Sequence, residues 1–314
     1  GYSYETTETA WHLLTDFILP KVVGREAAGP EDVLSPVAWI RGHRMAKAAV
    51  EMAAWDLAAR IDGVSLSEKL GGTRETVPVG VSIGLQRTDE ALHEKVAGYV
   101  SEGYARIKIK IKPGRDVEML AGLRERFPDL SIMADANSAY RLSDADRLRE
   151  LDALALMMIE QPLAHDDFLE HARLQERLTT PVCLDESIES VEDVELALEL
   201  GSCRIVNIKP GRVGGLGTSR RIHDVMKARG LPVWCGGMLE SGVGRAHNVA
   251  LASLEGFTLP GDISASRRYW DQDVVIPEFE ISDGRMAVPE GPGIGVEPDL
   301  ERIESLTVRR QAFA

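Results

Sequence analysis

The sequence predicts an α/β protein whose central unit is a (β/α)7β barrel of the TIM type. Short runs rich in Val, Ile, Leu and Met recur about every 25 residues. Most are continuous rather than alternating, as in strands buried on both faces, and charged segments with helical spacing separate them. A doubly wound open sheet is the alternative, but there are eight runs and no Gly-rich dinucleotide turn follows the first. A parallel barrel is therefore expected.

Strands and helices alternate along the middle of the chain. Strands are expected at Val77–Gly84, Ala105–Ile111, Leu130–Ala134, Ala155–Ile159, Pro181–Leu184, Arg204–Ile208, Leu231–Cys235 and Phe257–Pro260. Helices are expected at Asp89–Glu102, Val117–Phe127, Asp167–Leu178, Val191–Leu200 and Thr218–Arg229. Gly103, Gly201 and Gly230 follow three of these helices, as is common at helix C-termini.

The two flanks of the chain do not follow this repeat. Residues 1–76 are expected to be helical, most clearly over Arg44–Arg60, and the chain after Tyr269 reads as short strands and turns. The apolar residues of the long helix recur at three- and four-residue steps, at Met45, Ala49, Met52, Ala53, Leu57 and Ile61. Residues 1–76 and 269–314 are expected to pack together as an α+β capping domain on a barrel of residues 77–268.

Composition narrows the class of protein. Of the 314 residues, 44% are hydrophobic and 27% charged, which is ordinary for a globular enzyme. A net charge of -14 argues against nucleic acid or an anionic membrane as partner, and no apolar run approaches the ~18 residues that span a bilayer. A small anionic substrate remains compatible, since nearby lysines can reverse the field in a pocket. Cys183, Cys203 and Cys235 lack CxxC spacing and are expected to be buried thiols in a reducing cytoplasm.

Three acidic residues stand at the ends of consecutive predicted strands. Asp135, Glu160 and Asp185 are spaced by 25 and 25 residues, so one falls at the same height in each β/α unit. A single acid there is usually a helix cap, but three in register would repel one another without a cation. Ligation by oxygen alone selects a hard cation, Mg²⁺ or Mn²⁺. The sequence therefore predicts that all three bind one divalent metal, with positions left for a substrate carboxylate.

Lysines flank these acids along the chain. Lys110 precedes them and Lys209 follows them, so the two are expected to approach the metal from opposite sides. Lys108 faces the same way as Lys110, because residues i and i+2 share one face of a strand. Contact between two ammonium groups would favour the neutral, basic form of Lys110, and Arg212 could act in the same way on Lys209. Such a set could remove a proton α to a carboxylate, giving an ene-diolate whose charge the metal stabilises.

Several long motifs resemble the enolase superfamily, muconate-lactonising subgroup. They are KIKIKPG (108–114), MADANSAY (133–140), IEQPL (159–163), CLDESI (183–188), NIKPGRVGG (207–215) and WCGGMLESGVGRAHN (234–248). The family most similar is that of the o-succinylbenzoate synthases and N-succinylamino acid racemases, and the likeness runs from about residue 2 to about residue 300. A lysine or histidine base with Mg²⁺ is the established arrangement in enolase-superfamily sites.

The resemblance implies roles for individual residues. The three acids match the Mg²⁺ ligands, and Lys110 and Lys209 match the acid/base catalysts. Other matches are Lys108, which would polarise the substrate carboxylate, Asn137 beside the metal ligands, and Ser82, Gly237 and Met238 on the succinyl side of the pocket. Members dehydrate 2-succinyl-6-hydroxy-2,4-cyclohexadiene-1-carboxylate to o-succinylbenzoate, a step towards menaquinone, and many racemise N-succinylamino acids. Dehydration needs one lysine base, whereas racemisation needs both lysines.

Other interpretations remain open at this stage. Dipeptide epimerases share the lysines and acids but usually carry DxD on the eighth strand, where this chain reads Asp262-Ile263-Ser264. Muconate cycloisomerase and a barrel that binds metal without catalysis are further alternatives. Relatives carry residues ahead of the first helix that form the sheet of the cap, so the cap strands are expected to be missing here. A homo-oligomer is expected, as is common for such barrels.

Overall fold

The computed structural model describes residues 2–313. Its strands are β1 (Thr76–Pro78), β2 (Gly80–Ile83), β3 (Arg106–Lys110), β4 (Ile132–Asp135), β5 (Ile159–Glu160), β6 (Val182–Leu184), β7 (Ile205–Ile208), β8 (Val233–Cys235), β9 (Val275–Ile276), β10 (Arg285–Ala287) and β11 (Glu297–Pro298). Its α-helices are α1 (Thr7–Leu13), α2 (Leu19–Val22), α3 (Arg44–Asp62), α4 (Leu66–Leu70), α5 (Asp89–Ser101), α6 (Val117–Arg126), α7 (Ala145–Arg149), α8 (Phe168–Gln175), α9 (Val191–Leu200), α10 (Pro210–Val213), α11 (Leu216–Ala228), α12 (Gly242–Ala252) and α13 (Leu300–Leu306). A π-helical turn η1 (Leu14–Ile18) and the 3-10 helices η2 (Pro30–Val37), η3 (Leu142–Asp144), η4 (Glu150–Leu154) and η5 (Ser266–Arg268) complete the elements.

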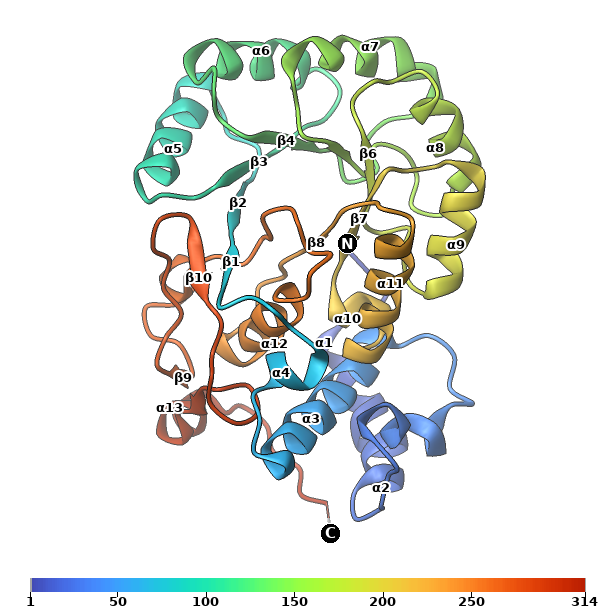
Figure 1. Cartoon of the computed structure of the whole chain (residues 1–314), viewed down its shortest axis with the longest axis vertical. Coiled ribbons are helices and arrows are strands. Elements are labelled where there is room, and N and C mark those ends of the chain that lie inside the picture. The colour runs from blue at the N-terminus through green and yellow to red at the C-terminus, as the bar shows by residue number, and fades with distance from the viewer. Residues whose placement is uncertain (1, 314) are drawn as a thin grey trace.

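Strands β2 to β8 form a parallel sheet in chain order, curled with its helices outside (Figure 1). This confirms the predicted TIM-like architecture. Local sequence sets the ends of the helices. In α9, the Ser190 side chain caps the first turn by accepting from the amide of Asp193, and Gly201 ends the helix in the left-handed conformation at φ 76°. The predicted strand Ala155–Ile159 is shifted, because Ala155 adopts φ 49° after η4 and the strand begins only at Ile159.

The expected eighth strand, Phe257–Pro260, is not a strand in the described chain. Phe257 forms a single bridge to Val233 of β8, and Gly261 forms one to Val79 beside β2. The amide of Gly80 donates to the Gly261 carbonyl at 2.7 Å. Pro260 has no amide hydrogen, so a continuous ladder is not available there. Residues 257–262, the seam of the barrel, therefore close it between β8 and β2 through isolated bridges.

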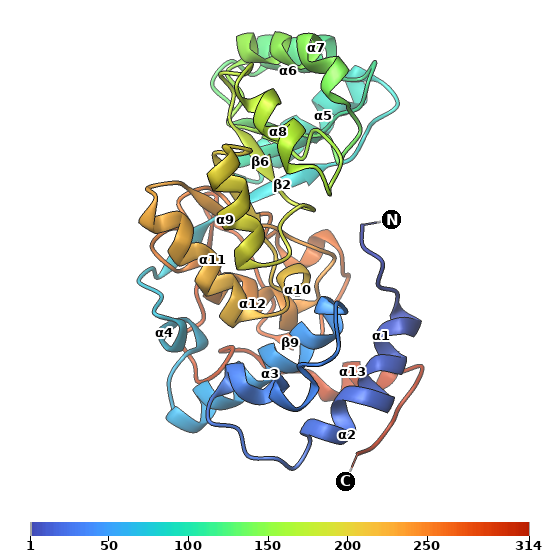
Figure 2. The ribbon, with the colours of Figure 1, turned by 90° about the vertical axis from the view of Figure 1, so that its right-hand side faces the viewer.

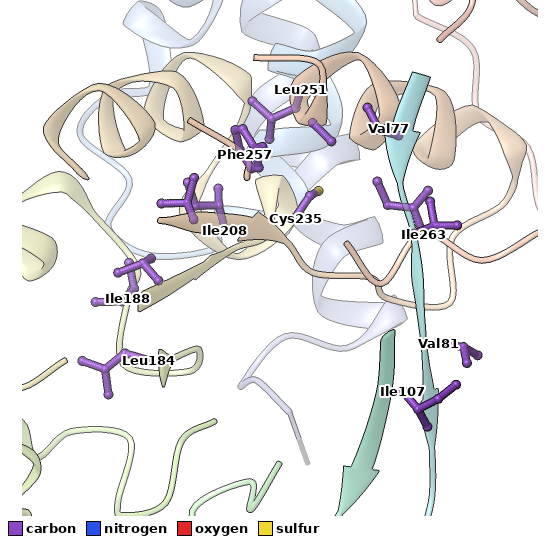
Figure 3. Packing of buried hydrophobic residues seen from close by; sticks show 14 of the residues in the cluster. Val77, Val81, Ile107, Leu184, Ile188, Ile208, Cys235, Leu251, Phe257 and Ile263 are labelled. Atoms are coloured by element: carbon purple, nitrogen blue, oxygen red, sulfur yellow. The ribbon is translucent and has the colours of Figure 1, made fainter. Parts of the chain in front are cut away.

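The two faces of the strands belong to different apolar clusters. Met133, Cys183 and Trp234 pack in one small cluster, whereas Ile132 and Ala134, on either side of Met133, belong to the large cluster that also holds the apolar faces of the helices. Figure 3 shows part of the large cluster, with Phe257, Leu251 and Ile208 around Cys235. Alternate residues of each strand therefore fill the barrel, and the remaining ones pack against the helices. All three cysteines are free and buried, as expected.

The helices of the two flanking segments, before and after the barrel, lie at the side of the molecule away from α5–α8. Figure 2 shows α1, α2, α3 and α13 grouped there. β1 pairs antiparallel with β10, Leu66 donates its amide to the Gly293 carbonyl at 2.6 Å, and Arg309 forms an ion pair with Glu8 at 2.9 Å. No helix within residues 2–313 is long and apolar enough to cross a membrane.

Helix α3 buries a different face from the one its apolar stripe suggested. Leu57 and Ile61 are 59% and 74% exposed, while Trp55 and Glu51 are each 4% exposed. The rest of the stripe lines an apolar cleft of about 480 Å³ against α12. Apolar spacing thus located the helix correctly but not the face that meets the barrel.

Glu51 is the polar centre of that buried face. Its carboxylate accepts from the amides of Leu216 at 2.8 Å and Gly217 at 2.9 Å, and from the Trp55 indole at 2.8 Å. These amides begin α11, which has no side-chain cap of its own. A Cβ on Gly215, where φ is 133°, would lie 2.2 Å from the Glu51 carboxylate, so only glycine fits. Helix α3 therefore caps the barrel helix that follows Lys209 and Arg212.

Candidate active site

Strand register brings the predicted groups to one level at the carboxyl ends of the strands. Lys110 pairs with Asp135, and Asp135 pairs with Glu160, across β3, β4 and β5. Asp185 directly follows β6, and Lys209 directly follows β7. The acids and lysines predicted from spacing are thus brought together at one end of the barrel.

The backbone at these strand ends is locally specialised. Asn137 and Gln161 have φ of 41° and 40°, a conformation that Asn adopts more readily than most residues. Gln161 accepts from the Asp185 amide at 2.9 Å and donates to the Ser187 hydroxyl at 2.7 Å. Its buried amide therefore fixes the end of β5 to the end of β6, and so sets the place of the third acid.

The carboxylates and Lys108 form a buried charge network. Lys108 Nζ lies 3.2 Å from Asp135 and 3.1 Å from Glu160, while Lys110 Nζ lies 2.6 Å from Asp135. Burial opposes the charge of Asp135, but Lys108 and Lys110 outweigh it and lower its pKa. Burial, together with the charge of Asp135, raises the pKa of Glu160 well above its usual value. Burial would lower the pKa of Lys108, but Asp262 and the two acids raise it instead.

Asp185 has a separate set of cationic partners. Lys209 Nζ lies 2.8 Å from its carboxylate, and Arg212 forms a second ion pair with it. These cations overcome burial and lower the pKa of Asp185. Burial would lower the pKa of Lys209, but Asp185 outweighs it and the pKa is raised. Arg212 therefore meets Lys209 through the shared Asp185 carboxylate, a different geometry from the direct influence expected from sequence.

The donor set can be tested for its fit to a divalent cation. Within residues 2–313, no three His, Cys, Asp or Glu side chains stand in an arrangement that would hold a metal ion. The carboxylates of Glu160 and Asp185 instead pair with Lys108 and Arg212. The chemistry of the donors nevertheless fits a hard cation, because the groups are oxygens. Asn207 Oδ1 and Glu186 Oε2 are also buried oxygens without a hydrogen-bond partner. A metal would require the carboxylates to exchange ammonium partners for the cation, so ligation by the three acids stays a prediction.

A cavity of about 250 Å³ lies over this network. Its lining includes every predicted residue outside the three acids and Arg212: Ser82, Lys108, Lys110, Asn137, Lys209, Gly237 and Met238. Gly236 lets Lys209 reach the cavity, because a Cβ there would lie 2.6 Å from the lysine Cε. Asn137 donates from its side chain to Glu186 at 2.8 Å and from its amide to Asp135 at 3.1 Å, and it accepts from Lys110.

Sequence reasoning missed two parts of this site. Tyr2 lines the cavity, donates to Asp185 at 2.8 Å, and lies with its ring centroid 4.3 Å from Lys209 Nζ. Burial raises its pKa to about 12. Asp262 accepts from buried Arg106 at 2.6 Å and pairs with Lys108 at 2.6 Å. Asp262 stands at the DxD position, but nothing in the sequence indicates that it pairs with Arg106 and Lys108, and Tyr2 carries no sequence signal.

The fold and site define a parallel barrel that carries acid–base groups at the carboxyl ends of its strands. Residues 91–303 match the family described as enolase C-terminal domain-like, and residues 1–71 match the N-terminal domain of the mandelate racemase / muconate lactonizing enzyme family. The chain therefore belongs to the enolase superfamily of enzymes, as the sequence motifs implied.

Individual relatives show which enzymes of this superfamily the chain is similar to. An o-succinylbenzoate synthase of Geobacillus stearothermophilus is 54% identical over 312 residues, which is 99% of this chain and 83% of the relative. An N-succinylamino acid racemase of Thermus thermophilus is 50% identical over 307 residues, which is 98% of this chain and 83% of the relative. The crystal structure of an enolase-superfamily protein from Listeria innocua superposes with a TM-score of 0.93 at 48% identity, covering 97% of this chain and 82% of that one.

Proposed function

We propose that this enzyme removes a proton α to a carboxylate and acts as an o-succinylbenzoate synthase, an N-succinylamino acid racemase, or both. The observation that carries the proposal is the pair of lysines at the base of one cavity. Lys110 reaches Asp135 from β3, and Lys209 reaches Asp185 from the end of β7, so the acids lie between two proton-transfer groups. The names of the relatives support the same assignment.

Asp135, Glu160 and Asp185 would hold Mg²⁺ or another divalent cation. When bound, the cation would supply positive charge to a substrate carboxylate and to the ene-diolate that forms from it. Lys108, 3% exposed, adds a fixed ammonium on the same side of the cavity. Few water molecules fit a cavity of this size together with substrate, which strengthens these electrostatic effects.

Lys110 and Lys209 would have different roles in the two reactions. In the dehydration, unprotonated Lys110 takes the α-proton and then returns it to the hydroxyl on the neighbouring carbon, which leaves as water, while Lys209 contributes positive charge. In the racemisation, one lysine takes the α-proton from one face and the other returns a proton to the opposite face. Arg212, bound to the same carboxylate as Lys209, is proposed to favour the racemase by setting the position and basicity of Lys209.

The alternatives fit the site less well. A dipeptide epimerase needs a carboxylate for the substrate ammonium, but both oxygens of Asp262 are already paired, with Arg106 and Lys108, and residue 264 is Ser. A barrel that only binds metal would have no use for lysines on both sides of the acids. We further propose that the protein is a homo-oligomer in the cytoplasm. Each subunit would consist of a barrel and a cap that is formed by both ends of the chain.

Assays with both substrates test the proposed function. We expect conversion of 2-succinyl-6-hydroxy-2,4-cyclohexadiene-1-carboxylate and exchange of the α-hydrogen of N-succinylamino acids in D₂O, each requiring Mg²⁺. Lys110→Ala should abolish both reactions, whereas Lys209→Ala should abolish racemisation and leave exchange of one enantiomer. If neither substrate is turned over in the presence of metal and no exchange of the α-hydrogen is seen, the proposal is rejected and a binding protein is favoured.

A further inference from the structure

The substrate cavity carries one cation that the proposed chemistry does not use. Its lining contains Lys108, Lys110, Lys209 and Arg268, but Asp262 is its only carboxylate among the described residues. The lining is thus rich in positive charge, although the chain as a whole carries -14. The three lysines have acidic partners, whereas Arg268 forms no ion pair within residues 2–313.

The guanidinium of Arg268 is held rigidly by neutral groups. It donates to the carbonyl of Ser82 and to the hydroxyl of Tyr99, and its carbon lies 4.9 Å and 5.4 Å from the ring centroids of Tyr99 and Tyr269. Its Nε is buried without a hydrogen-bond partner. An arginine fixed between aromatic rings, with donor capacity left over, is well prepared to bind an anion.

Ser264 is a second residue whose side chain carries a polar atom without a hydrogen-bond partner within residues 2–313, and it lines the same cavity as Arg268. The two residues together form one wall of this cavity. The Ser264 side chain lines the cavity, the residue is 3% exposed, and its hydroxyl has no hydrogen-bond partner in the described chain. Buried polar atoms without partners are uncommon and often mark a place where a ligand completes the bonding. Ser82 connects Arg268 to the lysine that would polarise the substrate carboxylate, because it is the register partner of Lys108 and its carbonyl accepts from Arg268.

We infer that Arg268 and Ser264 bind a second carboxylate of the substrate, distinct from the carboxylate that Lys108 and the metal ligands activate. This inference rests on the proposed function and extends it, since it assigns selectivity for dicarboxylates to named residues. A neutral acyl group leaves the guanidinium unpaired, and a substrate ammonium meets a cation there. The wall thus selects an N-acyl group that ends in an anion.

Paired substrates test the inference. We expect Arg268→Met to lower kcat/KM for an N-succinylamino acid by about 10- to 100-fold, mainly through KM, as for the loss of a charge-assisted hydrogen bond. The N-acetyl derivative of the same amino acid should change by no more than about twofold, and Arg268→Lys should restore part of the loss. Arg267→Met is the matched control, because that neighbouring arginine pairs with Glu102 at 3.1 Å and does not line the cavity.

The outcomes separate this inference from the proposed function. Equal losses on both substrates, or an unchanged preference for the succinyl group, would overturn the role of Arg268 while leaving the catalytic proposal in place. If the wild type turns over neither substrate, the proposed function fails. Calorimetry with o-succinylbenzoate and 2-butyrylbenzoate, in which a methyl replaces the distal carboxylate, then still decides: only the first should lose affinity in Arg268→Met, and an equal change in both would reject the subsite.

Discussion

Replacement of Glu51 tests whether helix α3 controls the loop that carries Lys209 and Arg212. In Glu51→Gln one oxygen becomes an amide that cannot accept, so at least one of the buried amides of Leu216 and Gly217 loses its partner. An unpaired buried donor costs about 1–3 kcal/mol, and loss of a negative charge at a helix N-terminus costs about 0.3–1 kcal/mol. The expected loss of unfolding free energy is therefore about 1.3–4 kcal/mol.

Thermal unfolding measures this loss. At roughly 2 °C per kcal/mol for a chain of this size, the midpoint should fall by about 3–8 °C. The matched control is Glu31→Gln, because Glu31 also lies against the start of α11 but its side chain is 42% exposed, so its midpoint should move by about 1 °C or less. Racemase kcat in Glu51→Gln should also fall at temperatures well below the midpoint. An unchanged midpoint would refute the view that Glu51 caps α11.

Three further predictions concern the catalytic groups. Chelation of divalent cations should abolish both activities, with recovery on adding Mg²⁺ but not Na⁺, as followed by proton exchange in D₂O. Arg212→Met should reduce racemisation about 10-fold or more relative to dehydration, since it leaves Asp185 with one cation fewer; equal effects on both rates would remove its proposed role. Tyr2→Phe keeps the ring beside Lys209 but loses the bond to Asp185, so kcat should fall about 3- to 10-fold while Tyr2→Ala falls further; identical rates in the two variants would show that the ring contributes nothing.

The catalytic pattern was readable from sequence because each group stands at the end of a buried strand or directly after it. The three acids and Lys209 end apolar runs that recur about every 25 residues, so their common level follows from the geometry of a parallel barrel. The residues that support them were not readable. Arg106 and Asp262 lie 156 residues apart and Glu51 and Leu216 lie 165 apart, and nothing in either local sequence indicates the partner.

Two other differences between the sequence prediction and the structure also have physical reasons. The stripe on α3 identified an amphipathic helix, but spacing alone does not say which neighbour covers which face, and Leu57 is exposed. The run Phe257–Pro260 is apolar enough for a strand, yet Pro260 cannot donate to a ladder.

The seam of the barrel has a consequence for how this enzyme could diversify. The acids and lysines of the reaction lie at or directly after the ends of strands that are joined by ladders, where a change of backbone would disturb several neighbours. Asp262, Ser264 and Arg268 lie on and just after a closure made of isolated bridges. Substitutions and short insertions there can reshape one wall of the cavity without altering strand register. The fold thus separates the groups of the reaction from an adjustable choice of substrate, and new specificities should arise first in the chain that follows Phe257.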